Sequence, residues 1–202
     1  MKSFYDYQSV LETELSGIKE KGLNPKLLLH ACCAPCSSYV IEYLREYFDI
    51  TVYFFNPNIY PEQEYFRRLE EIKLFLINFG KDQKIELIYD EYKPAEYITC
   101  VKGLESEKEG GIRCDRCFDL RLSKTAGKAK DMHFDYFTTT LTVSPHKNAE
   151  AINSIGIDLS KKYDIKYLVS DFKKKSGFKR SLELSTEYGL YRQNYCGCEF
   201  SV

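Results

Sequence analysis

The feature that most constrains the fold is a cysteine-rich turn between a short apolar run and an amphipathic segment. The run Leu27-Leu28-Leu29 leads into H-A-C-C-A-P-C, His30 to Cys36, and S-S-Y-V-I-E-Y-L follows. This pattern predicts a strand, a tight turn and a helix, with three thiols between the strand's C-terminal end and the helix N-terminus. Open α/β sheets bind ligands at that edge, and the helix dipole favours a thiolate or a thiolate-bound metal there. Two adjacent thiols with a third three positions on suit metal ligation better than core packing.

Apolar runs and helical segments alternate along the rest of the chain. The predicted strands are 27–31, 50–55, 85–89, 135–140 and 166–170, and the predicted helices are 4–20, 36–48, 61–79, 94–104, 115–131, 147–163 and 178–188. Strands separated by helices imply a parallel sheet with helices on both faces. We therefore predict a single α/β domain over 1–202 with a doubly wound five-stranded parallel sheet. A helical insertion is expected at about 94–131 and a cysteine-containing tail at 189–202.

Composition excludes several classes of protein. Of the 202 residues, 44% are hydrophobic and 29% charged, which argues against both disorder and a membrane span. The first residues carry acids and lack an apolar core segment, so we expect no signal peptide, no membrane partner and a cytoplasmic location. In that compartment eight cysteines indicate metal or redox chemistry rather than a disulfide framework.

Two further cysteine pairs follow the first group. Cys114 and Cys117, in R-C-D-R-C-F, form a C-x-x-C at the opening of a predicted helix, which is compatible with zinc, an iron–sulfur cluster or a redox couple. Cys196 and Cys198, in Y-C-G-C, suit a shared metal, a strained and easily reduced disulfide, or a tail pinned by zinc. Cys100 is interpreted as ordinary packing.

The number of thiols narrows these options. One tetrahedral zinc or one [4Fe–4S] cluster takes four cysteines, so the candidates exceed one centre. The surplus favours an electron-transfer enzyme over a zinc-stabilised module.

The charge distribution suggests a nucleic-acid contact near the C-terminus. Although the net charge is −1, residues 165–202 hold seven Lys or Arg against four Asp or Glu. A basic run such as D-F-K-K-K-S-G-F-K-R is often only a solvated loop, but aromatic residues lie among and after these cations. The candidate nucleic-acid-binding residues are Lys147, Lys173, Lys174, Lys175, Arg180 and Arg192, with Tyr191 or Tyr195 as a stacking surface; the family resemblance described next implies that the nucleic acid is tRNA.

Five motifs in order resemble the QueH-type epoxyqueuosine reductases. They are H-A-C-C-A-P-C-S-S-Y, N-P-N-I-Y-P, G-G-I-R-C-D-R-C-F-D-L-R-L, F-T-T-T-L-T-V-S-P-H-K-N and L-Y-R-Q-N-Y-C-G-C-E-F-S, and the resemblance runs from about residue 25 to the C-terminus. It implies an enzyme that reduces epoxyqueuosine to queuosine at the tRNA wobble position, the last step of queuosine biosynthesis, without cobalamin. It also implies a Rossmann-like sheet of the adenine-nucleotide α-hydrolase-like type.

The resemblance also implies site roles. The family's [4Fe–4S] ligands match Cys32, Cys33, Cys114 and Cys117, and its redox-active pair matches Cys196 and Cys198. Cys36 is left for a second, mononuclear iron or for packing. The electrons would come from an external donor such as a ferredoxin or a flavodoxin.

Epoxide reduction needs two electrons, two protons and a place for an oxyanion, which suggests roles for nearby residues. We hypothesise an iron near the Cys32/Cys33 turn that holds the epoxide oxygen. Asp115 is a candidate acid or extra ligand, against the alternative of a helix N-terminal acid. His30 is a candidate proton donor, against the alternative of a satisfied buried histidine. His146 is expected near substrate, and His133 at the surface.

Two rival classes remain at this stage. A zinc or iron–sulfur module that binds tRNA without redox activity would have a closed four-ligand site. A thiol–disulfide oxidoreductase that uses Cys196 and Cys198 would need no iron. Metal and sulfide content separates all three possibilities.

Overall fold

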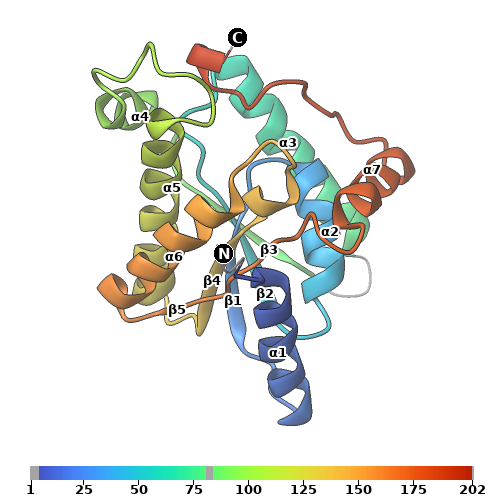
Figure 1. The fold of residues 1–202 in the computed structure, drawn as a ribbon. Coiled ribbons are helices and arrows are strands. Elements are labelled where there is room, and N and C mark those ends of the chain that lie inside the picture. Colours follow the sequence, from blue (N-terminus) through green and yellow to red (C-terminus); the bar gives the residue numbers. More distant parts are fainter. Residues whose placement is uncertain (1–4, 81–83, 202) are drawn as a thin grey trace.

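Five parallel strands form one sheet at the centre of the molecule (Figure 1). The computed structural model describes residues 5–80 and 84–201. The strands are β1 (Lys26–His30), β2 (Asp49–Phe54), β3 (Glu86–Tyr89), β4 (Tyr136–Thr139) and β5 (Lys166–Tyr167). Their order across the sheet is β3-β2-β1-β4-β5, and every neighbouring pair is parallel. The predicted doubly wound α/β fold is therefore confirmed.

Helices cover both faces of this sheet. They are α1 (Tyr7–Glu20), α2 (Ala34–Leu44), α3 (Glu62–Phe79), α4 (Pro94–Cys100), α5 (Ile112–Asp131), α6 (Ala149–Tyr163) and α7 (Gly177–Glu187), with two short 3-10 helices, η1 (Thr140–Val143) and η2 (Glu199–Ser201). Side chains alternate between the faces of a strand. Leu27 and Leu29 accordingly pack with α1, α2 and α3, whereas Leu28 packs with α5 and α6. The three leucines are fully buried, as expected for a central parallel strand.

The site of interest lies where the chain changes direction across the sheet. Strands β2 and β3 are added on one side of β1, and β4 and β5 on the other. The carboxyl ends of β1 and β4 therefore border the topological switch point, with His30 in register with Thr139. The cysteine turn follows β1 at this position.

Helix α2 begins earlier than the predicted range of 36–48. Cys33 adopts an extended conformation as the N-cap, and Pro35 lies in the first turn, where its missing N–H costs no hydrogen bond. Cys36 is therefore the third residue of the helix rather than the first. The helix ends at Leu44, and Phe48 packs into the core from the turn that follows.

Strand β5 is shorter than the predicted 166–170. After Tyr167 one more main-chain bond follows, from the N–H of Leu168 to the carbonyl of Phe137. Side chains then take over: Thr138 Oγ1 donates to the carbonyl of Leu168, and the Asn153 amide bonds both the N–H and the carbonyl of Ser170. Helix α1 starts at Tyr7, because the Asp6 side chain caps its N-terminus. Residue 4 of the predicted helix 4–20 lies outside the described residues.

The segment 94–131 consists of two different parts. Helix α5 packs against β1, β4 and α6 and forms part of the layer over the sheet. Helix α4 packs against α5 and, with the loop 101–111, lies beyond the carboxyl edge of the sheet (Figure 1). Helix α5 starts at Ile112, so Cys114 and Cys117 lie within its first two turns.

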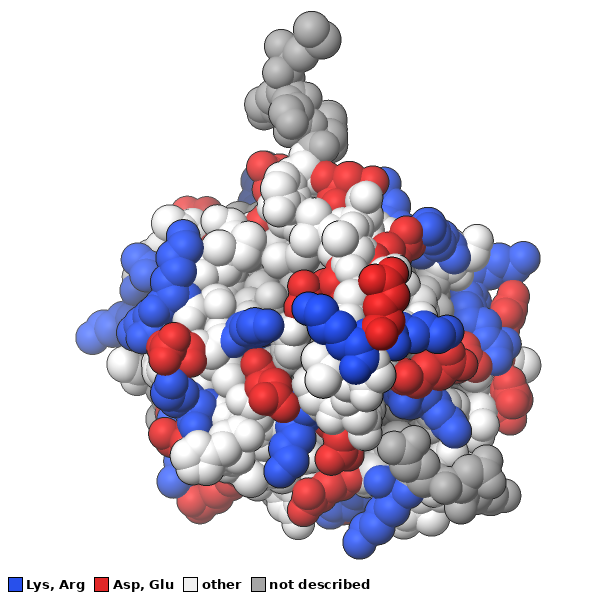
Figure 2. Space-filling view, turned by 90° about the horizontal axis from the view of Figure 1, so that it is seen from below, with Lys and Arg blue, Asp and Glu red and all other residues white. Residues whose placement is uncertain are grey.

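No helix among residues 5–80 and 84–201 is long and apolar enough to cross a bilayer. On the face seen in Figure 2, Lys and Arg side chains are interspersed with Asp and Glu side chains. This mixture agrees with a net charge of −1.

Candidate active site

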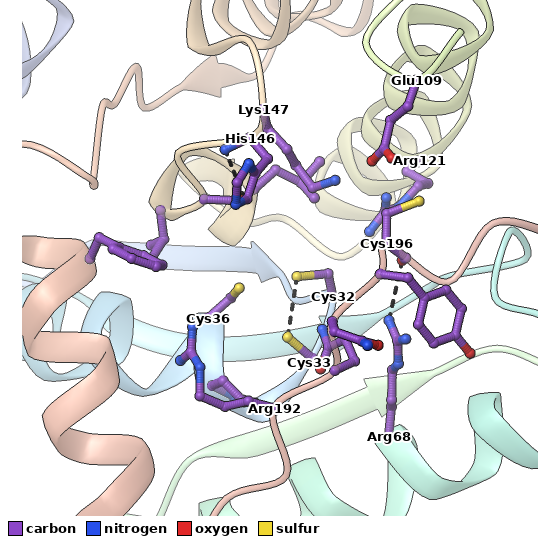
Figure 3. A pocket seen from close by; sticks show the side chains of 18 residues that line it. Cys32, Cys33, Cys36, Arg68, Glu109, Arg121, His146, Lys147, Arg192 and Cys196 are labelled. Carbon is purple, nitrogen blue, oxygen red and sulfur yellow. Dashed lines mark hydrogen bonds between the residues drawn. The ribbon is translucent and has the colours of Figure 1, made fainter. Parts of the chain in front are cut away.

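A cavity of about 550 Å³ opens at the carboxyl ends of β1 and β4 (Figure 3). Four cysteines contribute to its walls, Cys32, Cys33 and Cys36 from the turn after β1 and Cys196 from the C-terminal tail. Its lining also includes five basic side chains, Arg68, Arg121, His146, Lys147 and Arg192, and one carboxylate, Glu109. Thiols and cations thus face the same space.

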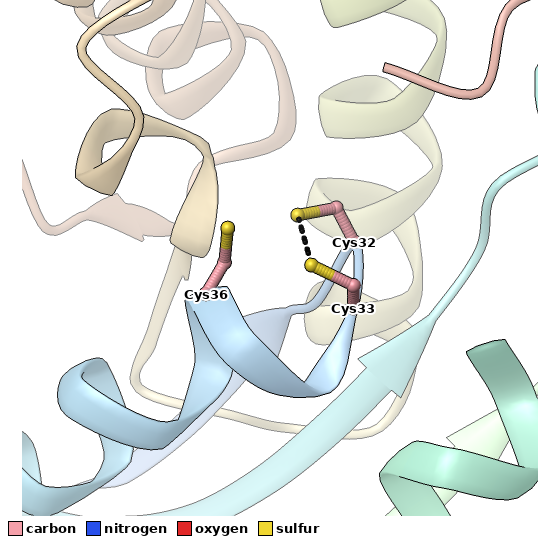
Figure 4. Close-up of side chains that lie close together, drawn as sticks. All are labelled: Cys32, Cys33 and Cys36. Atoms are coloured by element: carbon pink, nitrogen blue, oxygen red, sulfur yellow. Dashed lines mark hydrogen bonds between the residues drawn. The ribbon is translucent and has the colours of Figure 1, made fainter. Parts of the chain in front are cut away.

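The first cysteine group converges on one point. The Sγ atoms of Cys32, Cys33 and Cys36 all lie within 4.8 Å of one another, with 3.6 Å between Cys32 and Cys33 (Figure 4). Within residues 5–80 and 84–201, this is the one group of three or more His, Cys, Asp or Glu side chains close enough to share a metal ion. Thiolates are soft ligands that suit zinc, copper(I) and iron–sulfur clusters, so the donor set fits the predicted kind of cofactor.

The three thiols do not share charge equally. Hydrogen bonds from the Cys33 and Cys36 thiols lower the pKa of Cys32 well below its usual range, and the positive charge of Arg121 adds to the effect. The same hydrogen bond with Cys32 raises the pKa of Cys33 to about 12 and also raises the pKa of Cys36. The turn therefore stabilises one thiolate, on Cys32, next to two protonated thiols.

His30 is a fully buried, neutral ring beneath this turn. Burial, followed by the charge of Arg121, lowers the pKa of His30 to about 3. Nε2 of the ring lies 3.3 Å from Arg121 Nε and 3.2 Å from the carbonyl oxygen of Phe55, and Nδ1 lies 2.8 Å from Thr139 Oγ1. His30 does not line the cavity, and its contacts hold the end of β1 against β4.

The second cysteine pair lies beside the cavity rather than in its wall. Cys114 is half-buried and accepts a hydrogen bond from the Gly110 N–H, while Cys117 is buried in a small cluster with Tyr97, Val101 and Cys198. The structure thus places Cys36, not this pair, in immediate contact with Cys32 and Cys33. Asp115 is half-buried on the first turn of α5 and does not line the cavity.

The tail pair consists of two thiols in different environments. Hydrogen bonding from Cys198, assisted by Ser201 and the charge of Lys147, lowers the pKa of Cys196 to about 4. Cys198 is buried, its Sγ lies 2.7 Å from the phenol oxygen of Tyr97, and the Cys196 thiolate raises its pKa. Cys196 lines the cavity, so the more reactive thiol of the pair is the one that faces it.

The tail that carries this pair is held along its length. The guanidinium of Arg67 stacks over the Tyr191 ring at 3.4 Å, the N–H of Tyr60 donates to the carbonyl of Gly197 over 2.7 Å, and Arg113 donates to the carbonyl of Phe200 over 3.1 Å. Residues 192–196 therefore form one wall of the cavity.

The predicted tRNA-binding cations fall into two groups. Lys147 and Arg192 line the cavity, together with Tyr195 and His146. Away from it, Lys173 pairs with Asp171, Lys175 with Glu12 and Arg180 with Glu42, and Lys174 is exposed in the same turn as Lys173. Only the first group presents its charge to the space that the thiols face.

The sequence matches a known family over most of its length. The family described as "Epoxyqueuosine reductase QueH" matches residues 27–202. The chain belongs to the QueH family of epoxyqueuosine reductases. The predicted resemblance is therefore confirmed, and membership of a family of oxidoreductases disfavours a metal-binding module without redox activity.

QueH relatives from distant bacteria match nearly the whole chain. The Streptococcus pyogenes protein is 48% identical over 199 residues, which cover 98% of this chain and 78% of the relative. The Staphylococcus epidermidis protein is 44% identical over 98% of this chain and 84% of its own length. The Thermotoga maritima protein is 37% identical over 87% of this chain and 90% of its own length.

Solved structures of other proteins share the fold of this QueH family member. The U34-tRNA thiolase NcsA from Methanococcus maripaludis, solved with its [4Fe-4S] cluster, superimposes with a TM-score of 0.53 at 16% identity and covers 96% of this chain and 69% of its own. A predicted subunit of a tRNA methyltransferase from Methanocaldococcus jannaschii gives 0.50 at 14% identity, over 82% of this chain and 75% of its own. At these identities the similarity shows the architecture alone.

Proposed function

We propose that this chain reduces epoxyqueuosine in tRNA to queuosine with an iron–sulfur cluster bound at the cysteine cavity. The observation that carries the proposal is the shared cavity, in which Cys32, Cys33, Cys36 and Cys196 face the same space as Lys147 and Arg192. Thiolates can hold an iron–sulfur redox centre, and cations attract the tRNA polyanion. One cavity therefore combines electron transfer with substrate binding. Family membership supports the identity of the substrate. The site of action proposed is the cytoplasm, where reduced thiols persist.

The proposed cluster ligands are Cys32, Cys33, Cys114 and Cys117. Cys114 supports this set because it packs in the same hydrophobic cluster as Cys32, on the α5 side of the sheet. Cys36 remains as a further thiol at the cavity, available to a second iron. A [4Fe–4S] cluster bound there supplies electrons singly, and no cobalamin is involved in the proposal.

The chain's own residues bind and orient the tRNA. Lys147 and Arg192 line the cavity and would pair with phosphates near the modified nucleotide, and the Tyr195 ring would offer a stacking surface. Arg121 is buried in the same cavity wall and keeps its inner part positive. This arrangement would place the modified base over the thiols while the sugar-phosphate backbone of the tRNA stays at the mouth of the cavity.

The tail pair can balance the reaction. Removal of the epoxide oxygen as water consumes two electrons and two protons. Oxidation of the Cys196 and Cys198 dithiol to a disulfide releases two of each, and an external donor of the ferredoxin or flavodoxin class would regenerate the dithiol. Cys196 faces the cavity and Cys198 lies behind it against Tyr97, which suits a relay between donor and substrate.

The test is metal analysis and turnover on the same anaerobic preparation. We expect about four irons and about four acid-labile sulfides per chain. Reduced protein should convert epoxyqueuosine-containing tRNA to queuosine-containing tRNA, detected by mass spectrometry of the nucleosides.

Two variants set the controls for this test. Cys33→Ser should lose both sulfide and conversion. Cys100→Ser should keep both, because Cys100 lies on α4 with its thiol against the carbonyl of Arg116. Zinc without sulfide, and no conversion, would overturn the proposal.

A further inference from the structure

Arg121 is a buried cation without a carboxylate partner. It lies in the third turn of α5, and the whole residue is 3% exposed. Its guanidinium donates to Asn56 Oδ1 over 2.6 Å and to His30 Nε2 over 3.3 Å, and Nη1 lies 3.9 Å from Cys117 Sγ. Each of these partners is neutral unless the thiol is ionised. Within the described residues, no carboxylate oxygen lies within 4.0 Å of it.

The other two buried arginines have different kinds of partner. Arg68 pairs with Glu64 at 2.6 Å, and Arg113 donates to the main-chain carbonyls of Glu105, Glu107 and Phe200. Glu109, the acid in the cavity wall, is exposed, so solvent screens its charge. Of the two buried arginines that line the cavity in the described part of the chain, Arg121 is therefore the one without a carboxylate counter-ion.

An unpaired buried charge costs several kcal/mol, so Arg121 needs an anion nearby. The groups nearby that can become anions are thiols. Arg121 Nη1 lies 3.9 Å from Cys117 Sγ, and Arg121 lines the same cavity as Cys32 and Cys33. A [4Fe–4S] centre bound by four thiolates is anionic, and it gains a further negative charge on reduction.

We propose that Arg121 is a positioning residue for the iron–sulfur cluster, whose fixed buried charge offsets the cluster's negative charge and raises its reduction potential. The inference rests on the proposed function, because it needs the cluster to bind at this cavity. The one-electron reduced cluster is stabilised more than the oxidised cluster, because it carries the larger negative charge. The effect should persist in high salt, since the guanidinium is out of contact with solvent.

The test is an anaerobic redox titration of the loaded protein, followed by visible absorption and electron paramagnetic resonance. Arg121→Met removes the charge at similar length and should lower the equilibrium constant for one-electron reduction at least tenfold, a shift of about 59 mV. Arg121→Lys keeps the charge but loses the planar fork, and it should stay within about threefold of the wild type. The matched control is Lys128→Met on the same helix, because Lys128 is already paired with Asp90 at 2.6 Å.

The outcomes separate the two proposals. If Arg121→Met keeps full iron and sulfide with an unchanged potential, Arg121 does not act on the cluster, while the reductase assignment stands. Equal shifts in Arg121→Lys and Arg121→Met would mean that packing rather than charge matters, and would also overturn the inference. A wild-type chain that binds no cluster overturns the proposed function and the inference together.

Discussion

The guanidinium of Arg68, on α3, donates a hydrogen bond from Nη1 to the carbonyl oxygen of Cys196 over 3.2 Å. The two residues are 128 positions apart, and the bond joins the helix layer to the tail at the wall of the cavity. Arg68 is 1% exposed and is held by Glu64, so its own position is fixed. The position of Cys196 over the cysteine turn therefore depends on a side chain that the cysteine motifs do not reveal.

Gly197→Ala should displace the tail from this contact. Gly197 has a φ of +99°, and a Cβ there would lie 3.0 Å from Arg68 Nη1 and 3.2 Å from Ile59 Cγ1. We expect at least a tenfold loss of single-turnover conversion, together with faster hydrogen exchange in the tail. The control is Gly189→Ala, which has a φ of +62° but nothing within 4 Å, so it carries the backbone penalty of about 1–2 kcal/mol without the clash. Equal losses in the two variants would contradict a specific contact.

The pH dependence of alkylation should distinguish Cys196 from an ordinary thiol. Its pKa of about 4 means that the thiolate is fully formed well below neutrality, so in the reduced, metal-free protein its rate with iodoacetamide should be flat between about pH 6 and pH 8. Burial raises the pKa of Cys100, so its rate should rise about tenfold per pH unit over the same range. Peptide mass spectrometry measures both sites in one sample. A tenfold slope at Cys196 that matches the slope in urea would show that the folded tail does not activate it.

Serine variants should identify the cluster ligands. Because Cys36 lies beside Cys32 and Cys33 but is not among the proposed ligands, Cys36→Ser should retain about four sulfides per chain, whereas Cys117→Ser should lose most of them. Cys100→Ser again serves as the reference. The reverse pattern, with sulfide lost from Cys36→Ser and kept by Cys117→Ser, would assign Cys36 to the cluster in place of Cys117.

Cations of the cavity wall should contribute more to tRNA affinity than the lysines of the basic run 173–175. Lys147→Ala and Arg192→Ala should each weaken tRNA binding several-fold and reduce the slope of log affinity against log salt by about 1. Lys175→Ala should change affinity less than about twofold, because Lys175 already faces Glu12 at 2.5 Å. Fluorescence anisotropy at several salt concentrations makes the comparison. A larger loss from Lys175→Ala would move the interface to α7 and its preceding turn.

The sheet and the edge that carries the site were predictable because the signals are local. Leu27 to Leu29 and the run 50–55 are continuous apolar segments, and the turn residues between them and the next helices are adjacent in sequence. Parallel strands end at one edge, so the position of the cysteine turn follows from the strand that precedes it.

The electrostatics of the site could not be predicted in this way, because the charged side chains contact residues that are distant in sequence. A cation within D-L-R-L on a helix is typical of a solvated face, yet Arg121 is buried by Asn56 and His30, which lie 65 and 91 positions away. Arg180 is predicted to bind tRNA, and its ion pair with Glu42, 138 positions away, is not visible in the sequence. The proximity of Cys36 to Cys32 and Cys33, by contrast, agrees with the local spacing of two adjacent thiols and a third three positions on.

The way the tail is held also sets an order of assembly. The residues that receive it, Tyr60 and Arg68, are synthesised long before Cys196 and Gly197, so the sheet and the cysteine turn can form while this wall of the cavity is missing. Domains fold as the nascent chain emerges, at about 5–20 residues per second. During translation the thiols of the turn are therefore open on the side that the tail later covers, and a cofactor can enter from that side before the wall closes.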